Sequence, residues 1–257
     1  STVGAVGLWQ FMPPTAKGLG LKIDNYVDER RDPYKSTKIA LDYLSKLYSE
    51  FGSWELTLAA YNCGSARVRK AIRYSGGSKD FWKIRRYLPA ETRKYIPRFI
   101  AANYVVNFYH LHDLTPKFPG FELQWTRTTK VYNYLTFGQI SKNTGTQVSL
   151  LYKLNPGYRK GIIPSNPRGN FLVLPEPAMA KFNTWQGGKT NRQTVQNTEL
   201  TKSTYVVLAG DTIGKLAKMF NCSITDIVRW NNLKSGEIFY RQELIIYRRD
   251  GGGEKRA

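Results

Sequence analysis

The stretch Ala59-Ala60-Tyr61-Asn62-Cys63-Gly64 ends a run of residues that is apolar nearly all round. That run, residues 54–62, predicts a buried helix. Gly64 can adopt the left-handed conformation that ends such a helix, and Ser65 can cap the next one. Tyr61 and Asn62 are therefore expected at a tight corner between two helices. Taken alone, the pattern favours a structural role in which both side chains bond to nearby backbone.

Composition narrows the class of protein. The 257 residues are 41% hydrophobic and 14% aromatic, which is enough for packed cores and excludes a disordered chain. Thirty-nine basic residues against nineteen acidic ones give a net charge of +20 and predict an anionic partner. Nucleic acid, an anionic membrane face and a carboxylate-bearing wall polymer all fit this charge. No apolar run reaches membrane-spanning length, and residues 1–7 resemble the middle of a longer protein.

Neither a metal site nor a disulfide scaffold is predicted. Cys63 and Cys222 are far apart in the chain and fall in regions that we expect to belong to different domains. His110 and His112 are two residues apart, a spacing that does not place them on one helix face.

A second informative stretch, Gly7-Leu8-Trp9-Gln10-Phe11, has one polar side chain among apolar ones. Gln10 either bonds to backbone inside a core or faces a polar ligand, and the residues do not decide between these. Asp32-Pro33 predicts the start of a helix that ends at Gly52. A further helix is expected from Glu91 towards Tyr109, kinked or interrupted at Pro97.

After residue 113 the chain becomes polar, rich in expected strands, and internally repeated. The segment 136–142 parallels 212–218, and Asn155 falls in register with Asn231. Each repeat reads strand, short helix, short helix, strand. The predicted strands are 130–134 and 171–174 in the first repeat, and 204–208 and 243–247 in the second.

The second repeat resembles a LysM domain, a small βααβ module that binds glycans containing N-acetylglucosamine. Gly210-Asp211-Thr212 and Trp230-Asn231 stand where LysM domains carry these residue types, whereas Tyr240-Arg241-Gln242 departs from the usual Pro-Gly-Gln. The resemblance implies glycan binding through Gly210, Asp211 and Thr212. The first repeat lacks this turn and is expected to bind weakly or not at all.

The first 110 or so residues resemble the family 1 lytic transglycosylases, most closely the membrane-bound murein transglycosylase D type. The residues that carry the resemblance are Gly7-Leu8-Trp9-Gln10, Ala60-Tyr61-Asn62-Cys63-Gly64, Glu91-Thr92-Arg93-Lys94-Tyr95 and the segment 28–33. The implied fold is a mainly α, goose-lysozyme-like domain followed by small α+β LysM modules. The expected division is 1–115 for a transglycosylase domain without its N-terminal portion, 125–176 for a degenerate LysM-like module, 177–203 for a polar linker, 204–248 for a LysM domain and 249–257 for a tail.

The resemblance also implies roles for individual residues. Gln10, Tyr61, Asn62 and Tyr95 would bind the sugar, and Glu91 would support them. The family's catalytic glutamate belongs to a Glu-Ser pair that precedes the residue matching Ser1, so we expect these 257 residues to lack it. That glutamate would act first as general acid and then as base, while the substrate's own N-acetyl group and C6 hydroxyl attack the anomeric carbon.

The expected function is cleavage of the MurNAc-GlcNAc β-1,4 bond in peptidoglycan, with formation of 1,6-anhydro-MurNAc and without a cofactor or metal. The expected location is the periplasm or cell envelope, with possible membrane anchoring through a missing N-terminus. The alternative is a non-catalytic protein that only binds peptidoglycan. Nucleic acid is not an expected partner, because the aromatic residues follow core periodicities and no DNA or RNA motif is present.

Overall fold

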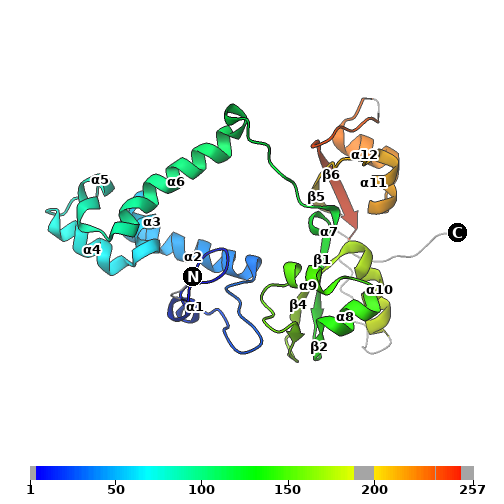
Figure 1. Ribbon diagram of the computed structural model, residues 1–257, viewed down its shortest axis with the longest axis horizontal. Helices are drawn as coiled ribbons and strands as arrows, with labels where there is room; N and C mark the ends of the chain where they lie inside the picture. Colours follow the sequence, from blue (N-terminus) through cyan, green and yellow to red (C-terminus); the bar gives the residue numbers. More distant parts are fainter. Residues whose placement is uncertain (1–3, 188–199, 235, 250–257) are drawn as a thin grey trace. The chain divides into compact units, whose positions relative to one another are not determined.

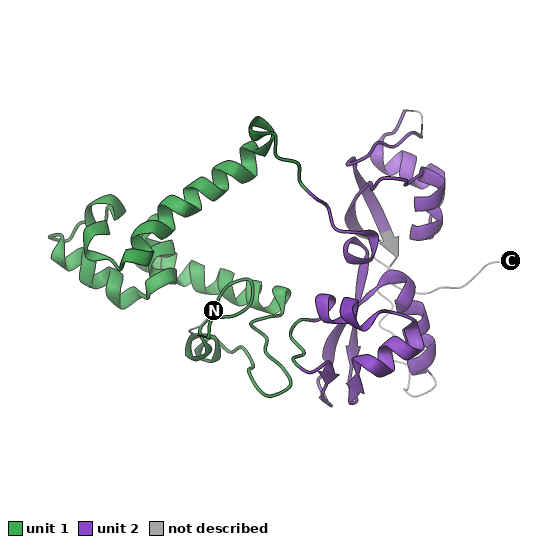
Figure 2. Cartoon of the chain, viewed as in Figure 1, with its two compact units in different colours: residues 1–116, 156–159 green, residues 117–155, 160–257 purple. Residues whose placement is uncertain are grey.

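The computed structural model describes residues 4–187, 200–234 and 236–249. The chain forms two compact units (Figure 2). The first comprises residues 1–116 with the short segment 156–159, and the second comprises residues 117–155 with 160–257. No described helix is both long enough and apolar enough to span a lipid bilayer.

The first unit is helical (Figure 1). In chain order its elements are α1 (Pro13–Gly18), α2 (Pro33–Phe51), α3 (Trp54–Cys63), α4 (Ser65–Tyr74), α5 (Phe81–Ile84), the 3-10 helix η1 (Arg85–Tyr87), α6 (Ala90–Phe108) and the 3-10 helix η2 (Tyr109–His112). Helix α3 is central, since it packs against α2, α4 and α6. Its buried side chains join those of its neighbours in one hydrophobic core.

The helix boundaries follow the capping residues. Asp32 accepts a hydrogen bond from the backbone N–H of Lys35 at the start of α2, as the sequence predicts, and Ser53 caps α3 through Leu56. Gly64 ends α3 with φ of 89° and ψ of 144°, so it lies outside the left-handed helical region that we expected. Ser65 is wrongly predicted as a cap, because Gly64 already precedes the first turn of α4.

Two further expectations for the helices are corrected. The helix over 54–62 is confirmed, but Trp54 is 56% exposed, so α3 is not buried on all sides. Helix α6 continues through Pro97 without interruption. Its later half is exposed on all sides and carries large apolar side chains, among them Phe99, Ile100 and Val106.

The second unit contains both repeats. Before and within the first are α7 (Phe121–Gln124), β1 (Thr126–Val131), β2 (Leu135–Thr136), α8 (Phe137–Thr144), α9 (Val148–Leu154), β3 (Ile162–Ile163), β4 (Asn170–Pro175) and α10 (Glu176–Gly187). The second repeat contains β5 (Leu200–Val206), α11 (Ile213–Phe220), α12 (Ile224–Asn231) and β6 (Glu243–Arg249). Strand β1 pairs antiparallel with β4, and β5 pairs antiparallel with β6. A short additional pair, β2 with β3, is absent from the prediction.

The two aligned asparagines confirm the repeat at the level of single hydrogen bonds. The Asn155 amide donates to the carbonyls of Leu151 (3.1 Å) and Val173 (2.8 Å) and accepts from the Val173 N–H (2.7 Å). The Asn231 amide makes the same three bonds with Ile227 (2.9 Å) and Ile245 (2.9 and 2.6 Å). In each repeat one amide therefore ties the second helix to the last strand.

The predicted boundaries of the first repeat differ from the structure. Its first strand is 126–131 rather than 130–134. A helix, α10, occupies residues 176–187, where the sequence predicts a polar linker from residue 177. This helix forms because Ala178, Met179 and Phe182 supply an apolar face that is buried against α8 and β4. Residues 200–203, also predicted as linker, belong to strand β5, because they continue its backbone pairing with β6. Residues 188–199 of that linker and most of the predicted tail lie outside the described residues.

The core of the second repeat includes residues from before the first. Trp125 is 2% exposed and lies in one hydrophobic cluster with Tyr205, Phe220 and Leu244. Its ring centroid is 4.2 Å from that of Phe220. The Gln124 amide donates to the Val206 carbonyl (3.3 Å) and accepts from the Val206 N–H (2.9 Å). The core of the second repeat is therefore completed by residues that precede the first repeat in the chain.

Candidate functional site

The loop that carries Gln10 is shaped by a glycine. Gly7 has φ of +80°, and a Cβ built on it would lie 1.8 Å from the backbone oxygen of Arg30. Only glycine tolerates both the positive φ and this close approach. The turn brings the backbone N–H of Gln10 to 3.4 Å from the Gly7 carbonyl, and Gln10 itself has a φ of 51°.

A buried ion pair holds the same loop from behind. The Arg30 guanidinium binds both carboxylate oxygens of Asp28, with Nε–Oδ1 and Nη2–Oδ2 distances of 2.9 and 2.8 Å. Its Nη1 donates to the backbone carbonyls of Gly4 (2.8 Å) and Phe11 (3.0 Å). Both ends of the loop are therefore fixed by one side chain whose charge is compensated, as a buried charge requires.

Tyr61 connects this loop to helix α3. Its hydroxyl donates a 2.8 Å hydrogen bond to the Trp9 carbonyl, and its ring lies edge-on or tilted against Trp9, Phe11 and Tyr43. Burial raises the pKa of Tyr61 far above its usual value, and the neighbouring Tyr95 and Tyr43 hydroxyls raise it further. Tyr61 is therefore a neutral hydrogen-bond donor over the whole physiological range of pH.

Asn62 connects α3 to α6. Its Oδ1 accepts a 2.7 Å hydrogen bond from the hydroxyl of Thr92, which is buried. This bond leaves the half-buried Asn62 amide NH2 available as a donor. Tyr95, one turn further along α6, packs against the same core, and burial raises the pKa of its hydroxyl. Adjacent residues of α3 therefore contact two segments that are distant in the sequence.

The structure answers the question that the sequence left open for Gln10. Its side chain is exposed rather than in a core, and its Nε2 donates to the Gly7 carbonyl at 2.6 Å. Its amide oxygen makes no hydrogen bond among the residues that the structure describes, so it is available to a ligand. Glu91 lies exposed in the first turn of α6, and within the described chain it forms no ion pair or hydrogen bond that would orient a neighbour.

Cys63, the last residue of α3, is half-buried at the edge of the α3 core. Burial raises the pKa of its thiol, so the sulfur is a poor nucleophile there.

In the second repeat, the residues predicted to bind glycan form the turn between β5 and α11. Gly210 has φ of +83°, and Thr212 caps α11 through the backbone N–H of Lys215. The Asp211 carboxylate accepts from the Leu208 N–H (2.9 Å) and the Tyr205 hydroxyl (2.7 Å). The polar groups of Asp211 and Thr212 are thus used to build the turn.

Two positions that organise the site have no assigned role in the sequence analysis. Arg30 appears there only inside a family-like segment, and Thr92 only inside another. For Arg30, one sequence feature could have indicated the ion pair. Acidic and basic residues are clustered in Asp28-Glu29-Arg30-Arg31-Asp32, so oppositely charged side chains can pair there. For Thr92 no such signal exists, because its partner Asn62 lies thirty residues away.

Comparison with known families agrees with this architecture. The family model described as the transglycosylase SLT domain matches residues 1–84. The model for the LysM-like domain of lytic transglycosylase MltD matches residues 125–186, which include α10, and the LysM model matches residues 205–246. The chain therefore carries an SLT domain, an MltD LysM-like domain and a LysM domain. The predicted resemblance and the predicted fold class are both confirmed.

Individual relatives match all or part of this chain. The membrane-bound lytic murein transglycosylase D of Escherichia coli K12 is 29% identical over 260 residues, which cover 96% of this chain and 56% of that protein. The soluble lytic murein transglycosylase of the same strain is 35% identical over 107 residues, or 39% of this chain and 17% of that protein. A putative tributyltin chloride resistance protein of Alteromonas sp. strain M-1 is 41% identical over 69 residues, 26% of this chain and 33% of its own. The chain thus spans about half the length of the first of these relatives.

Proposed function

We propose that this chain, which combines a transglycosylase SLT domain with two LysM-type domains, belongs to a lytic transglycosylase that acts on peptidoglycan. The reaction would cleave the MurNAc-GlcNAc β-1,4 bond and form 1,6-anhydro-MurNAc. The observation that carries the proposal is the convergence on α3 of two segments that are distant in the sequence. The Gly7–Phe11 loop meets it through Tyr61, and α6 meets it through Asn62.

The donors and acceptors at this corner suit an N-acetylated sugar. The free Asn62 NH2 group can donate to a ligand carbonyl, and the exposed Gln10 amide oxygen can accept from a ligand N–H or hydroxyl. Tyr61 and Tyr95 would add aromatic surface and neutral hydroxyls. We assign sugar binding to Gln10, Tyr61, Asn62 and Tyr95. A supporting role is kept for Glu91 only through its position in the first turn of α6, where a carboxylate interacts favourably with the helix dipole.

The chemistry needs one carboxyl that first protonates the glycosidic oxygen and then acts as base. Among the described acidic residues, Asp28 is committed to Arg30, and Glu91 is exposed without a partner. Neither carboxyl is both buried and unpaired, as the general acid of this reaction needs to be. We therefore assign the general acid to a glutamate that precedes the residue matching Ser1 in the family.

The LysM domain would hold the protein on the glycan, since LysM domains bind polymers that contain N-acetylglucosamine. The net charge of +20 favours a polymer with free carboxylates. We propose the periplasm or cell envelope as the location, and a glycan-binding contribution from the turn at 210–212. For the division of the chain, we propose an SLT domain up to residue 116 and a LysM-like module that extends through α10.

The test compares two proteins on purified sacculi: the 257 residues alone, and the longest native reading frame that contains them. We expect anhydromuropeptides, identified by mass, from the longer protein only, because general acid catalysis contributes roughly a hundredfold to ten-thousandfold. In the longer protein, Asn62→Asp should lower turnover and leave sacculus binding unchanged, and Glu50→Gln, an exposed change on α2, should alter neither. Anhydro products from the 257-residue chain that are lost on Glu91→Gln would contradict our assignment of the acid.

The second candidate function is binding without catalysis. It is favoured by one observation, which is that no described carboxyl at the α3 corner is suited to act as an acid. A protein of this kind would bind sacculi and release no soluble product, whatever the length of the reading frame. Product analysis of the longer protein therefore separates the two functions.

A further inference from the structure

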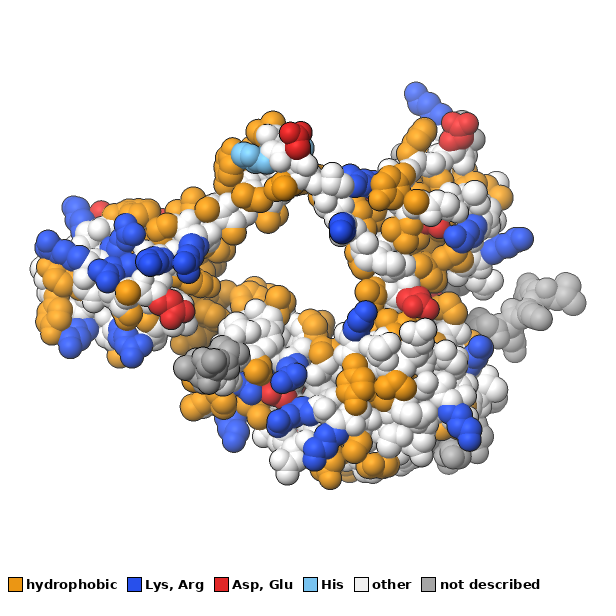
Figure 3. Space-filling view, viewed as in Figure 1, with side chains coloured by type: hydrophobic (Ala, Val, Ile, Leu, Met, Phe, Trp, Pro, Cys, Tyr) orange, Lys and Arg blue, Asp and Glu red, His pale blue; other side chains and the backbone are white. Residues whose placement is uncertain are grey.

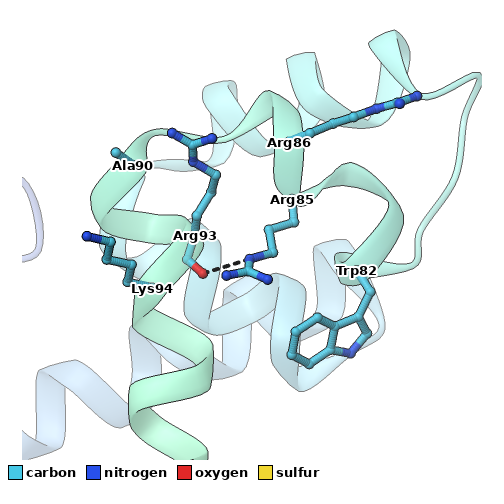
Figure 4. Close-up of a pocket in the computed structure, with 6 residues that line it drawn as sticks. All are labelled: Trp82, Arg85, Arg86, Ala90, Arg93 and Lys94. Atoms are coloured by element: carbon cyan, nitrogen blue, oxygen red, sulfur yellow. Dashed lines mark hydrogen bonds between the residues drawn. The ribbon is translucent and has the colours of Figure 1, made fainter.

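Beside the α3 corner, the first unit contains a cavity whose charged lining is entirely basic. It has a volume of about 400 Å³ and is lined by Trp82, Arg85, Arg86, Ala90, Arg93 and Lys94 (Figure 4). This volume lies within the range of small-ligand sites. The lining comes from α5, η1 and the first turns of α6. Figure 3 shows Lys and Arg side chains gathered over the same part of the unit.

The cavity is distinct from the proposed sugar site. Along α6, Thr92 and Ile96 face the core, whereas Ala90, Arg93 and Lys94 are exposed. At 100° per residue, Arg93 lies on one flank of that buried stripe, Tyr95 lies on the other flank, and Lys94 lies on the face opposite the stripe. A ligand in the cavity would therefore leave Tyr95 and Asn62 uncovered.

The four cations are not neutralised by the protein. Within the described part of the chain, none of them forms an ion pair with an Asp or Glu side chain. Arg85 is placed by its Nε, which donates to the Arg93 carbonyl at 3.0 Å, and its terminal nitrogens make no hydrogen bond to a described residue. Like charges held together in this way raise the local potential, and an anion would relieve it.

Trp82 adds a second kind of surface. Its side chain is 52% exposed, and the Arg85 guanidinium carbon lies 5.8 Å from its ring centroid (Figure 4). An exposed indole ring offers a flat apolar face, which matches the C–H face of a pyranose ring. A guanidinium group beside it offers paired N–H donors for a carboxylate.

From this juxtaposition we propose that the cavity is an accessory binding site for an acidic amino sugar. The sugar ring would lie on Trp82, and its carboxylate would bind Arg85 with help from Arg93 and Lys94. The chemical class is a pyranose with a carboxylate substituent, as in N-acetylmuramic acid. This identification of the ligand rests on the proposed function, because peptidoglycan is the polymer that supplies such a sugar. The site would bind a part of the glycan that is not undergoing cleavage.

The experiment measures binding to the full 257-residue chain by the NMR signal of the Trp82 indole N–H, assigned with Trp82→Phe. N-acetylmuramic acid and N-acetylglucosamine form a matched pair of ligands, since they differ only in the acidic lactyl group. We expect roughly tenfold tighter binding of the acid at this signal, from charge-assisted hydrogen bonds. The preference should weaken as salt is added.

The contribution of the cavity's positive charge to the preference for the acid is tested with two double variants, one inside the cavity and one outside it. Arg93→Gln combined with Lys94→Gln should reduce the preference to less than about twofold, because two of the cavity's exposed cations are lost. Arg73→Gln combined with Lys79→Gln removes the same charge from exposed positions outside the cavity and should leave the preference intact. An intact preference in the first double variant would overturn the proposal.

Further measurements distinguish other possible ligands, and they distinguish a failure of the accessory site from a failure of the proposed function. If inorganic phosphate shifts the Trp82 signal as strongly as N-acetylmuramic acid does, the cavity is a general anion site and the sugar assignment is overturned. An oligonucleotide that outcompetes the sugar would also overturn it. Binding of chito-oligosaccharide to the chain is measured in parallel at the LysM residues. If it persists while the Trp82 signal shows no acid preference, the accessory site is wrong and the proposed function stands. If neither glycan binds anywhere, the proposed function fails as well.

Discussion

The Tyr61 hydroxyl and the Trp9 carbonyl lie 2.8 Å apart, joined by a hydrogen bond across 52 residues of chain. This bond gives Tyr61 a partner within the protein and holds the loop that carries Gln10 against α3. The residue that the sequence analysis assigns to sugar binding thus also supports the loop that carries another assigned residue. Loss of its hydroxyl should therefore affect stability and function together.

Tyr61→Phe should lower the free energy of unfolding by about 1 kcal/mol, the usual value of one hydrogen bond, because the ring packing is kept. In the catalytically competent longer protein it should also lower turnover. Thermal denaturation and product release measure the two effects. Tyr34→Phe, at an exposed position on α2, is the control and should change neither. Unchanged stability would show that the hydrogen bond to Trp9 contributes nothing in solution.

Gly7→Ala should be severely destabilising, by about 1–3 kcal/mol or more, because the new Cβ would overlap the Arg30 carbonyl at a positive φ. The Gln10 loop should lose its fixed position as well, and hydrogen exchange at Phe11 should rise. Gly18→Ala is a matched control. Gly18 ends helix α1, and a Cβ there would meet nothing within 4 Å. If both variants unfold at the same denaturant concentration, the proposed clash is wrong.

The LysM turn should have a pH-dependent stability that comes from Asp211. Burial alone would raise the pKa of this carboxyl, but hydrogen bonds from Leu208, Tyr205 and Lys215 together lower it below 3.8. A lowered folded-state pKa contributes stability that is present above pH 3.8 and is lost as the pH falls through the folded-state pKa.

Asp211→Asn should accordingly cost roughly 2 kcal/mol or more at pH 7, since the Asp211 side chain is 4% exposed and accepts several bonds. The difference from the unsubstituted protein should shrink below pH 3.8. Hydrogen exchange at Leu208 and Leu216, measured at both pH values, reports this locally. Asp42→Asn, at an exposed position on α2, should leave exchange at both amides unchanged.

Trp125→Ala should destabilise the second repeat although it lies outside it in the sequence. Removal of a buried Trp side chain costs about 3–5 kcal/mol. Exchange at Leu216 and Leu244 should increase sharply, because these residues share the Trp125 cluster. Trp54→Ala, at an exposed position on α3, should leave both amides protected. Protection that is equal in the two variants would show that the second repeat is complete without Trp125.

Local signals in the sequence were sufficient for most of the fold. The cap at Asp32 and the register of Asn155 with Asn231 are short-range patterns, and the structure reproduces them. The start of β1 was misplaced by four residues because Arg127 to Thr129 carry no apolar alternation. Helix α10 was missed because its buried residues are few and a polar segment with Gly187-Gly188 follows them, a composition typical of a linker.

The site could be predicted only in part, for a related reason. The identities of Tyr61, Asn62 and Gln10 follow from a family resemblance, but their partners are set by tertiary contacts. Nothing near Tyr61 in the chain indicates that its hydroxyl is bonded to Trp9, and nothing near Asn62 indicates Thr92. The basic cavity could not be predicted from the sequence either, because Arg85 and Arg93 are brought together by the turn between η1 and α6.

Because Trp125 completes the core of the second repeat, we expect the first repeat to fold before the second. The Gln124–Val206 contact beside it spans 82 residues, and closing so long a loop in an unfolded chain is entropically costly. If the first repeat folds beforehand, its paired strands β1 and β4 hold Trp125 near the start of α10 and shorten the segment that must still be closed. The second repeat would then complete its core on a surface that already exists. Contact order, rather than domain size, is therefore expected to make this small C-terminal core the slow step in folding of the second unit.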